Sequence, residues 1–196
     1  MTGFDIRPGF SENQRARAAL LYWRAFAGKL GKVLAPEQKA LELLGNILDP
    51  RFAISAVDRT GQLLGIVGFK SQEGSFSEGG FGPMFKVYGL FGGLWRALAL
   101  STLERSIGPG ILLIDGIFVA ADRRGEGIGG ALLEAIIKEA QRRDIREIWL
   151  DVVDTNPRAR ALYERAGFVA KETEGTGPLA GLFGFKSGTK MTKSVV

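Results

Sequence analysis

Residues 111–119 restrict the fold more than any other segment, because they form a nearly continuous apolar run that only Asp115 interrupts. Such a run is typical of a central strand buried on both faces. A glycine-rich segment, residues 124–130, follows it, and apolar residues then recur at helical spacing from about 127 to 143. The sequence therefore predicts a buried strand, a tight turn and an amphipathic helix at the centre of an α/β (α+β) fold.

Further helices and strands are predicted on both sides of this centre. The predicted helices occupy about residues 11–28, 36–48, 87–105 and 156–167, and the predicted strands residues 4–7, 52–57, 63–70, 145–153, 168–171 and 183–192. Residues 71–83 are rich in Gly, Ser and Glu and are predicted to form a loop. We find no internal repeat, and residues 1–196 are expected to form a single domain.

The absence of two residue types limits the chemistry that this chain can perform. It has no cysteine and no histidine, which excludes disulfides, thiolate metal sites and a cysteine acyl-enzyme and removes the commonest general base. Acid–base catalysis has to use carboxylates, tyrosine, lysine or water, and we expect no metal. The formal net charge of +5 favours a polyanionic partner, such as a nucleic acid, a membrane surface or a phosphorylated cofactor.

The sequence contains no segment that predicts export or membrane insertion. Residues 1–8 include no apolar signal core, and Arg96 interrupts the most apolar stretch, residues 87–103. We therefore expect a cytoplasmic protein with no membrane contact.

The turn after the central strand has the composition of a phosphate-binding segment. It consists of Arg124, Gly125, Glu126, Gly127, Ile128, Gly129 and Gly130. Glycines allow backbone N–H groups to close on a phosphate, and the following helix N-terminus adds a positive dipole end. A plain strand-to-helix connection needs fewer glycines. The G-x-G-x-x-G spacing also fits a dinucleotide site, but residues 120–124 separate it from the strand, which disfavours that interpretation.

Two ordered motifs resemble the GNAT superfamily of acyl-CoA-dependent N-acyltransferases. Arg124, Gly127 and Gly129 match its acyl-CoA motif [QR]-x-x-G-x-[GA], and residues 156–168 resemble its N-x-x-A-x-x-L-Y-x-x-x-G-F helix. The resemblance implies a mixed, mostly antiparallel central sheet flanked by helices. The 87–105 segment would be an extra amphipathic helix inserted before the central strand.

The resemblance also implies a role for individual residues toward acetyl-CoA as cosubstrate. The backbone of Ile117, Phe118 and Val119 would pair with the pantetheine arm, and the amides of residues 125–130 would hold the pyrophosphate. Asn156 would contact the pantetheine, and Tyr163 would lie beside the sulfur and protonate the leaving thiolate. Each has a structural alternative, since Asn156 can be only a helix cap and Tyr163 only a packed aromatic.

The transfer reaction calls for a general base. An alkylammonium group with a pKa near 10.4 has to lose a proton before it attacks, at a cost of roughly 4–5 kcal/mol at neutral pH. The candidates are Asp115 and Asp151, each acting through water, although either carboxylate can be purely structural. A backbone N–H near Val119 would meet the oxyanion. Without a cysteine to carry the acyl group, direct transfer in a ternary complex is expected.

The acceptor is predicted only as a primary amine of a small molecule or peptide. We expect it to bind near Trp23, Phe26, the 71–83 loop and the 87–105 helix, whose apolar face is expected to lie in the core or against a second copy of the chain in a homodimer. One rival interpretation is a non-catalytic CoA-binding module of the same fold. Another is a nucleic-acid-binding protein, but the arginines lack interleaved aromatics, so no nucleic-acid partner is expected.

Overall fold

The computed structural model describes residues 3–77, 79–102, 105–177 and 180–195. Within them, the strands join one sheet in the order β1-β2-β3-β5-β6-β8-β7, and β4 pairs only with β3. The strands are β1 (Asp5–Pro8), β2 (Ala53–Val57), β3 (Leu63–Ser71), β4 (Gly74–Ser75), β5 (Ile111–Val119), β6 (Glu147–Val153), β7 (Val169–Gly175) and β8 (Ser187–Ser194). Every pairing is antiparallel except that of β5 with β6. The predicted mixed, mostly antiparallel sheet is confirmed.

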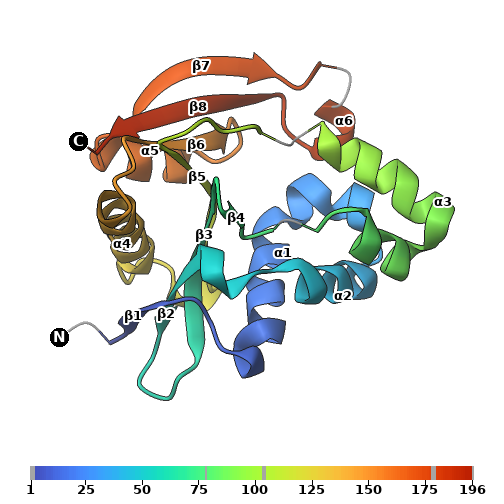
Figure 1. The fold of residues 1–196 in the computed structure, drawn as a ribbon, viewed down its shortest axis with the longest axis horizontal. Helices are drawn as coiled ribbons and strands as arrows, with labels where there is room; N and C mark the ends of the chain where they lie inside the picture. The colour runs from blue at the N-terminus through green and yellow to red at the C-terminus, as the bar shows by residue number, and fades with distance from the viewer. Residues whose placement is uncertain (1–2, 78, 103–104, 178–179, 196) are drawn as a thin grey trace.

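Helices cover both faces of this sheet. They are α1 (Arg15–Leu34), α2 (Glu37–Ile47), α3 (Phe81–Ser101), α4 (Ile128–Arg142), α5 (Pro157–Arg165) and the short α6 (Ala180–Phe183). In Figure 1, α4 lies on one side of the central strands, α1 and α2 lie on the other, and α3 forms the outermost layer beyond α2. None of the described helices combines the length and apolarity needed to cross a membrane.

The core forms where the central strands meet α4 and α1. Strand β3 is almost entirely buried. The apolar residues of α4 recur every three or four positions, as a helix with one buried face requires: Ile128, Leu132, Leu133, Ile136 and Ala140. This packing fixes the start of α4 against the end of β5, because Ile128 is only 1% exposed.

Several element boundaries differ from those predicted. The helix predicted from residue 11 begins with a capping box between Ser11 and Gln14, which opens a 3-10 turn, Glu12–Gln14, that leads into α1. Helix α1 also continues beyond Gly28 to Leu34, because buried Leu30, Val33 and Leu34 supply contacts that outweigh the low helix propensity of glycine. The segment predicted as the 71–83 loop contains β4 and the start of α3, and α6 replaces the expected start of β8.

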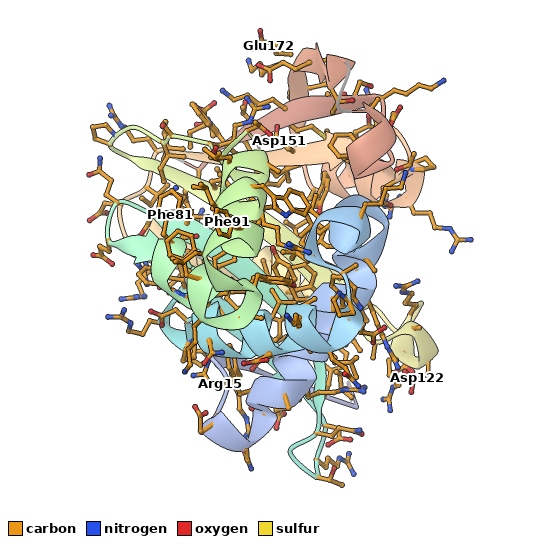
Figure 2. All side chains as sticks on the ribbon, turned by 90° about the vertical axis from the view of Figure 1, so that its right-hand side faces the viewer. Arg15, Phe81, Phe91, Asp122, Asp151 and Glu172 are labelled. Atoms are coloured by element: carbon orange, nitrogen blue, oxygen red, sulfur yellow. The ribbon has the colours of Figure 1, made fainter. Side chains whose placement is uncertain are left out.

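The prediction that the apolar face of α3 lies in the core is wrong for most of its length. Gly89 interrupts the helix with φ 71° and ψ 174°, so residues before and after it do not share one continuous helical face. Beyond the kink, Ala97, Ala99 and Leu100 still pack against the core. The large apolar side chains predicted to be buried are exposed, from 43% for Trp95 to 91% for Phe91: Leu90, Phe91, Leu94, Trp95 and Leu98. Figure 2, which faces this side, shows Phe81 and Phe91 on the outer surface of α3. Coverage by a second copy stays a prediction.

Candidate active site

The two parallel strands at the centre of the sheet separate part-way along their length. Their pairing extends from Ile111 opposite Glu147 to Ile114 opposite Leu150. Beyond that point β5 continues to Val119 and β6 to Val153, but each pairs only with its outer neighbour, β3 or β8. The facing edges of β5 and β6 therefore border a gap, and their backbone N–H and C=O groups on that side form no hydrogen bonds between the two strands.

The alternation of hydrogen-bonded and non-bonded pairs between β5 and β3 determines which backbone groups of β5 face this gap. The N–H of Ala120 donates to the carbonyl of Leu64 at 2.8 Å, and antiparallel pairs alternate between hydrogen-bonded and non-bonded positions. The Val119 and Ile117 pairs with β3 are therefore of the non-bonded type. Their N–H and C=O groups point into the gap, whereas those of Phe118 point to β3. An extended ligand can pair with this edge as an added strand.

Asp115 occupies a bulge at the point where the strands part. Gly116 lies opposite Gly68 and Ile114 opposite Phe69, so Asp115 is the extra residue in β5. The bulge turns its half-buried carboxylate toward the cavity beside the sheet. There it accepts a hydrogen bond from the Ser75 hydroxyl at 3.3 Å.

The glycine turn has the geometry of an anion site. Gly125 and Gly127 have φ of +89° and +82°, and a Cβ at either position would meet no other atom within 4 Å. Gly127 is the N-cap of α4, and the N–H of Ala131 donates to its carbonyl at 3.0 Å. The amides of residues 128–130 precede this first intrahelical bond and have no partner within the helix. These three N–H groups, at the positive end of the helix dipole, suit a phosphate.

The charged residues of this turn differ in their surroundings. Glu126 forms an ion pair with Arg123 at 2.9 Å. Arg124 is exposed and has no ion-pair partner among the described residues. Arg124 is therefore the available cation beside the amides, whereas Glu126 and Ile128 can contribute only their backbone, because the Ile128 side chain is buried in the core.

One cavity of about 740 Å³ joins residues from both parted strands and from α5. The predicted site residues on its wall are Asp115, Ile117, Phe118, Asp151, Asn156 and Tyr163. The glycine turn does not line it and lies beyond the end of β5, where a Cβ on Gly129 would approach Leu162 of α5 at 3.7 Å and Val119 at 3.9 Å. The cavity, the gap and the turn therefore follow one another along β5.

Asn156 and Tyr163 each make the contacts expected of a purely structural residue, a helix cap and a packed aromatic ring respectively. The carboxamide oxygen of Asn156 accepts the Ala159 N–H at 3.2 Å, so Asn156 is an N-cap of α5. The ring of Tyr163 packs against Phe168 with centroids 6.0 Å apart. Burial raises the pKa of Tyr163 to about 12, and no hydrogen-bond partner of its hydroxyl occurs among the described residues. Because both side chains also line the cavity, these features are compatible with a second role.

The two candidate bases have different neighbours. Asp151 forms an ion pair with Arg105 at 3.3 Å, and Arg105 also pairs with Glu174 at 2.8 Å. The Asp151 carboxylate is therefore part of a charged network on the cavity wall. Asp115 instead faces Tyr22, whose pKa is raised by burial and further by the charge of Asp115. Within the described part of the chain, no group of three or more acidic, His or Cys side chains could hold a metal ion.

The cavity wall corrects one of the expected acceptor contacts. Trp23 is 7% exposed, belongs to the core and does not line the cavity, whereas its neighbour Tyr22 and Phe26 do. The rings of Tyr22 and Phe26 lie 4.8 Å apart. Sequence reasoning missed Tyr22, although its spacing of four residues from Phe26 places the two on one helix face. It also missed Arg105, for which the sequence has no local signal.

Comparison with known proteins agrees with this geometry. The model of the acetyltransferase (GNAT) family matches residues 17–168, which is more than half of the chain. The chain belongs to the GNAT acetyltransferase family. A curated relative, the [ribosomal protein bS18]-alanine N-acetyltransferase of Escherichia coli K12, is 44% identical over 52 residues, which cover 26% of this chain and 35% of the relative. The matched segment thus spans about a third of that protein.

Solved structures share the GNAT fold over nearly the whole chain. A GCN5-related N-acetyltransferase from Kribbella flavida has 19% identity and a TM-score of 0.62, with 98% of each chain covered. The yncA protein of Salmonella typhimurium, solved with its cofactor acetyl-CoA, has 14% identity and a TM-score of 0.59, with 99% of this chain and 95% of that chain covered. At these identities the likeness concerns the fold.

Seven arginines could form a nucleic-acid surface on this GNAT chain: Arg123, Arg124, Arg142, Arg143, Arg146, Arg158 and Arg160. Four of them form ion pairs with described residues, whereas Arg124, Arg146 and Arg158 form none there. Arg142 and Arg143 both contact Glu139, and Arg160 contacts Glu164. These contacts partly neutralise the basic face, and most join residues three or four apart, a spacing at which ion pairs are common on helices.

Proposed function

We propose that this protein is an N-acetyltransferase that transfers the acetyl group of acetyl-CoA to a primary amine by direct attack in a ternary complex. The observation that carries the proposal is the separation of β5 and β6, with the Asp115 bulge where the strands part and the free amides of α4 beyond the end of β5. The family is one of acetyltransferases. A gap with a carboxylate at one end and an anion site at the other suits an amine and a phosphorylated thioester.

The residues present fit acetyl-CoA in two places. The gap-facing groups of Ile117 and Val119 offer donors and acceptors to the amides of pantetheine. The amides of residues 128–130, with Arg124 beside them, offer donors and charge to the pyrophosphate. Asn156 lies on the cavity wall between these regions and α5. Bound acetyl-CoA supplies the activated thioester carbonyl that the amine attacks.

Asp115 is our preferred base. Its carboxylate lies at the bulge beside the cavity, whereas Asp151 is held by Arg105. Removing a proton from an alkylammonium group costs roughly 4–5 kcal/mol at neutral pH, and a positioned carboxylate, directly or through water, lowers that cost. The N–C bond then forms as the C–S bond breaks.

Two further groups complete the transfer. The gap-facing N–H of Val119 can stabilise the negative charge that develops on the carbonyl oxygen. The Tyr163 hydroxyl, protonated at neutral pH because burial raises its pKa to about 12, can give its proton to the leaving thiolate. The nitrogen loses two protons in all. Asp115 passes the first to solvent, and the second, lost after the N–C bond forms, returns through water to Tyr163 and replaces the proton given to the thiolate, so the reaction is balanced.

The acceptor of the E. coli relative does not transfer to this chain. That protein is an alanine N-acetyltransferase of ribosomal protein bS18, but the matched segment covers 35% of it. A peptide and a small amine therefore both remain acceptor classes at the level of the family.

Two matched variants test the proposal with acetyl-CoA as the probe. We expect saturating acetyl-CoA to raise the Tm of the wild type, Asp115→Asn and Asp151→Asn alike, because it binds the folded state. Thiol release with a reactive amine should fall by about 100-fold or more in Asp115→Asn at neutral pH and recover in part at high pH, where the amine is already neutral. Asp151→Asn should retain most of the rate.

The possible failures have different meanings. No Tm shift with acetyl-CoA would overturn the binding site. A Tm shift without thiol release from a broad amine set would support the CoA-binding module instead. Equal losses in the two variants, or a larger loss in Asp151→Asn, would reassign the base.

A further inference from the structure

We infer that the acceptor of this enzyme is a primary amine attached to an apolar chain or ring, and not a peptide N-terminus or a polyamine. The inference rests on the proposed acetyl transfer and specifies its substrate class. It follows from the unequal walls of the cavity that contains Asp115.

The helical walls of this cavity are almost wholly apolar. Among the described residues, those that α1, α2 and α3 contribute include only two with a polar side-chain atom, Tyr22 and Ser101. The others are Ala, Gly, Leu, Ile, Met and Phe, and none is charged. A wall of this kind stabilises a ligand by removing apolar surface from water and gives no partner to a buried amide.

Most polar side chains of the cavity lie on its sheet side, beside the bulge and along β6, where Asp151 and Arg105 line it. Asp115 projects from β5, and Ser75, which donates to it, lies on β4. Lys70 of β3 also lines the cavity, opposite Ser75 in the register of β3 and β4, so this end contains a cationic side chain as well as a carboxylate. An ammonium group at this end therefore meets the Asp115 carboxylate, and the part of the ligand that lies along α1, α2 and α3 meets hydrocarbon.

Two aromatic rings lie next to the carboxylate. Tyr22 and Phe26 of α1 contact each other and both contact the buried ring of Phe118, at centroid distances of 5.2 and 5.3 Å. The faces and edges of such rings favour aliphatic or aromatic groups and also a cationic nitrogen. The first carbons attached to the amine would therefore be placed between aromatic rings.

The apolar surface continues from the cavity to the outside along α3. Phe81 both lines the cavity and is 53% exposed. Beyond the kink, Leu90 and Phe91 are 72% and 91% exposed without lining the cavity. Figure 2 shows Phe81 and Phe91 on the same outward side of α3. A ligand with an apolar tail can thus keep apolar contact as far as the rim, whereas the amides of a peptide would meet only the Tyr22 and Ser101 hydroxyls from these helices.

A homologous series of amines tests this with acetyl-CoA at saturation. We expect kcat/KM for thiol release to rise about threefold to fourfold per methylene from butylamine to octylamine, or about 80- to 250-fold across the four added methylenes. The diamine 1,8-diaminooctane and the peptide Ala-Gly-Gly should be poorer than butylamine, because each places a charge or unpaired amides against the helical wall.

Two variants on one helix provide the matched control. Phe81→Asn removes an apolar group from the wall and should lower kcat/KM for octylamine about threefold to tenfold while leaving butylamine nearly unchanged. Phe91→Asn changes the same residue type outside the cavity and should leave both amines unchanged. Because both side chains are more than half exposed, neither variant should unfold the protein.

The outcomes separate this inference from the proposed function. A flat series, or a preference for the peptide or the diamine, would overturn the inference and leave acetyl transfer intact. If no amine releases thiol, acetyl transfer fails, and the Tm shift produced by each amine alone decides the inference. Octylamine shifting the Tm more than butylamine and 1,8-diaminooctane would then support it, and equal or absent shifts would overturn it.

Discussion

Replacing Tyr163 by phenylalanine removes one hydroxyl group and separates a chemical role of this side chain from a structural one. The ring is 7% exposed and packs on Phe168, and phenylalanine keeps that contact. No described group hydrogen-bonds the hydroxyl, so the substitution breaks no native hydrogen bond. We therefore expect the Tm and the affinity for CoA to change little.

The expected loss in rate follows from the pKa of the hydroxyl. A general acid contributes typically about 10²- to 10⁴-fold. Burial raises the pKa of Tyr163 from 10.0 to about 12, and with a Brønsted coefficient of about 0.5 an acid weaker by two pKa units loses about tenfold of that contribution. The kcat of Tyr163→Phe should accordingly fall by about 10- to 1,000-fold.

The assay is single-turnover acyl transfer with saturating acetyl-CoA and a reactive amine, because a slow product release would mask the effect in kcat. Tyr88→Phe is the matched control, since the Tyr88 hydroxyl donates to the Leu34 carbonyl and its ring is outside the cavity wall. The control should lower the Tm and leave transfer unchanged. Unchanged single-turnover transfer in Tyr163→Phe would refute the reasoning and leave water as the proton donor.

Three further predictions concern the turn, the kink and acid stability. Gly127→Val should abolish the Tm shift produced by acetyl-CoA, because φ is +82° there and a branched side chain would crowd the phosphate; a normal shift would place the pyrophosphate elsewhere. Gly89→Ala, at φ 71° and ψ 174°, should lower the free energy of unfolding by about 1–3 kcal/mol in urea titration, and an unchanged value would mean that the kink is not required. Hydrogen bonds from Arg142, aided by those from Arg143 and opposed by burial, lower the pKa of Glu139 from 4.5 to about 2. The ionised Glu139 should therefore add about 1–2 kcal/mol to the free energy of unfolding after solvent screening. This contribution should be complete above about pH 4.5 and lost as the pH falls through 2. Glu139→Gln should remove this part of the pH dependence of unfolding, and a wild-type profile in the variant would contradict the assignment.

The sequence by itself determined the strand, turn and helix from residue 111 to 142 and the capped helix that begins at Pro157. These elements depend on local rules: a continuous apolar run, glycines at positive φ, an Asn-Pro start and apolar residues at helical spacing. Such rules depend only on residues that are close in sequence, so the predicted boundaries of these strands and helices were correct to within a few residues. The family motifs occupy the same segments, which is why the site residues on them could be named.

Only the tertiary structure decided which side of each remaining helix faces the site. Successive residues of a helix point about 100° apart, so choosing Tyr22 over Trp23 requires knowledge of where β5 lies against α1. The kink at Gly89 likewise changes which residues of α3 are buried. Arg105 reaches Asp151 from a loop distant in sequence, and the gap between β5 and β6 depends on how far two strands stay paired. These features arise from contacts between distant segments, and periodicity within one segment has no information about them.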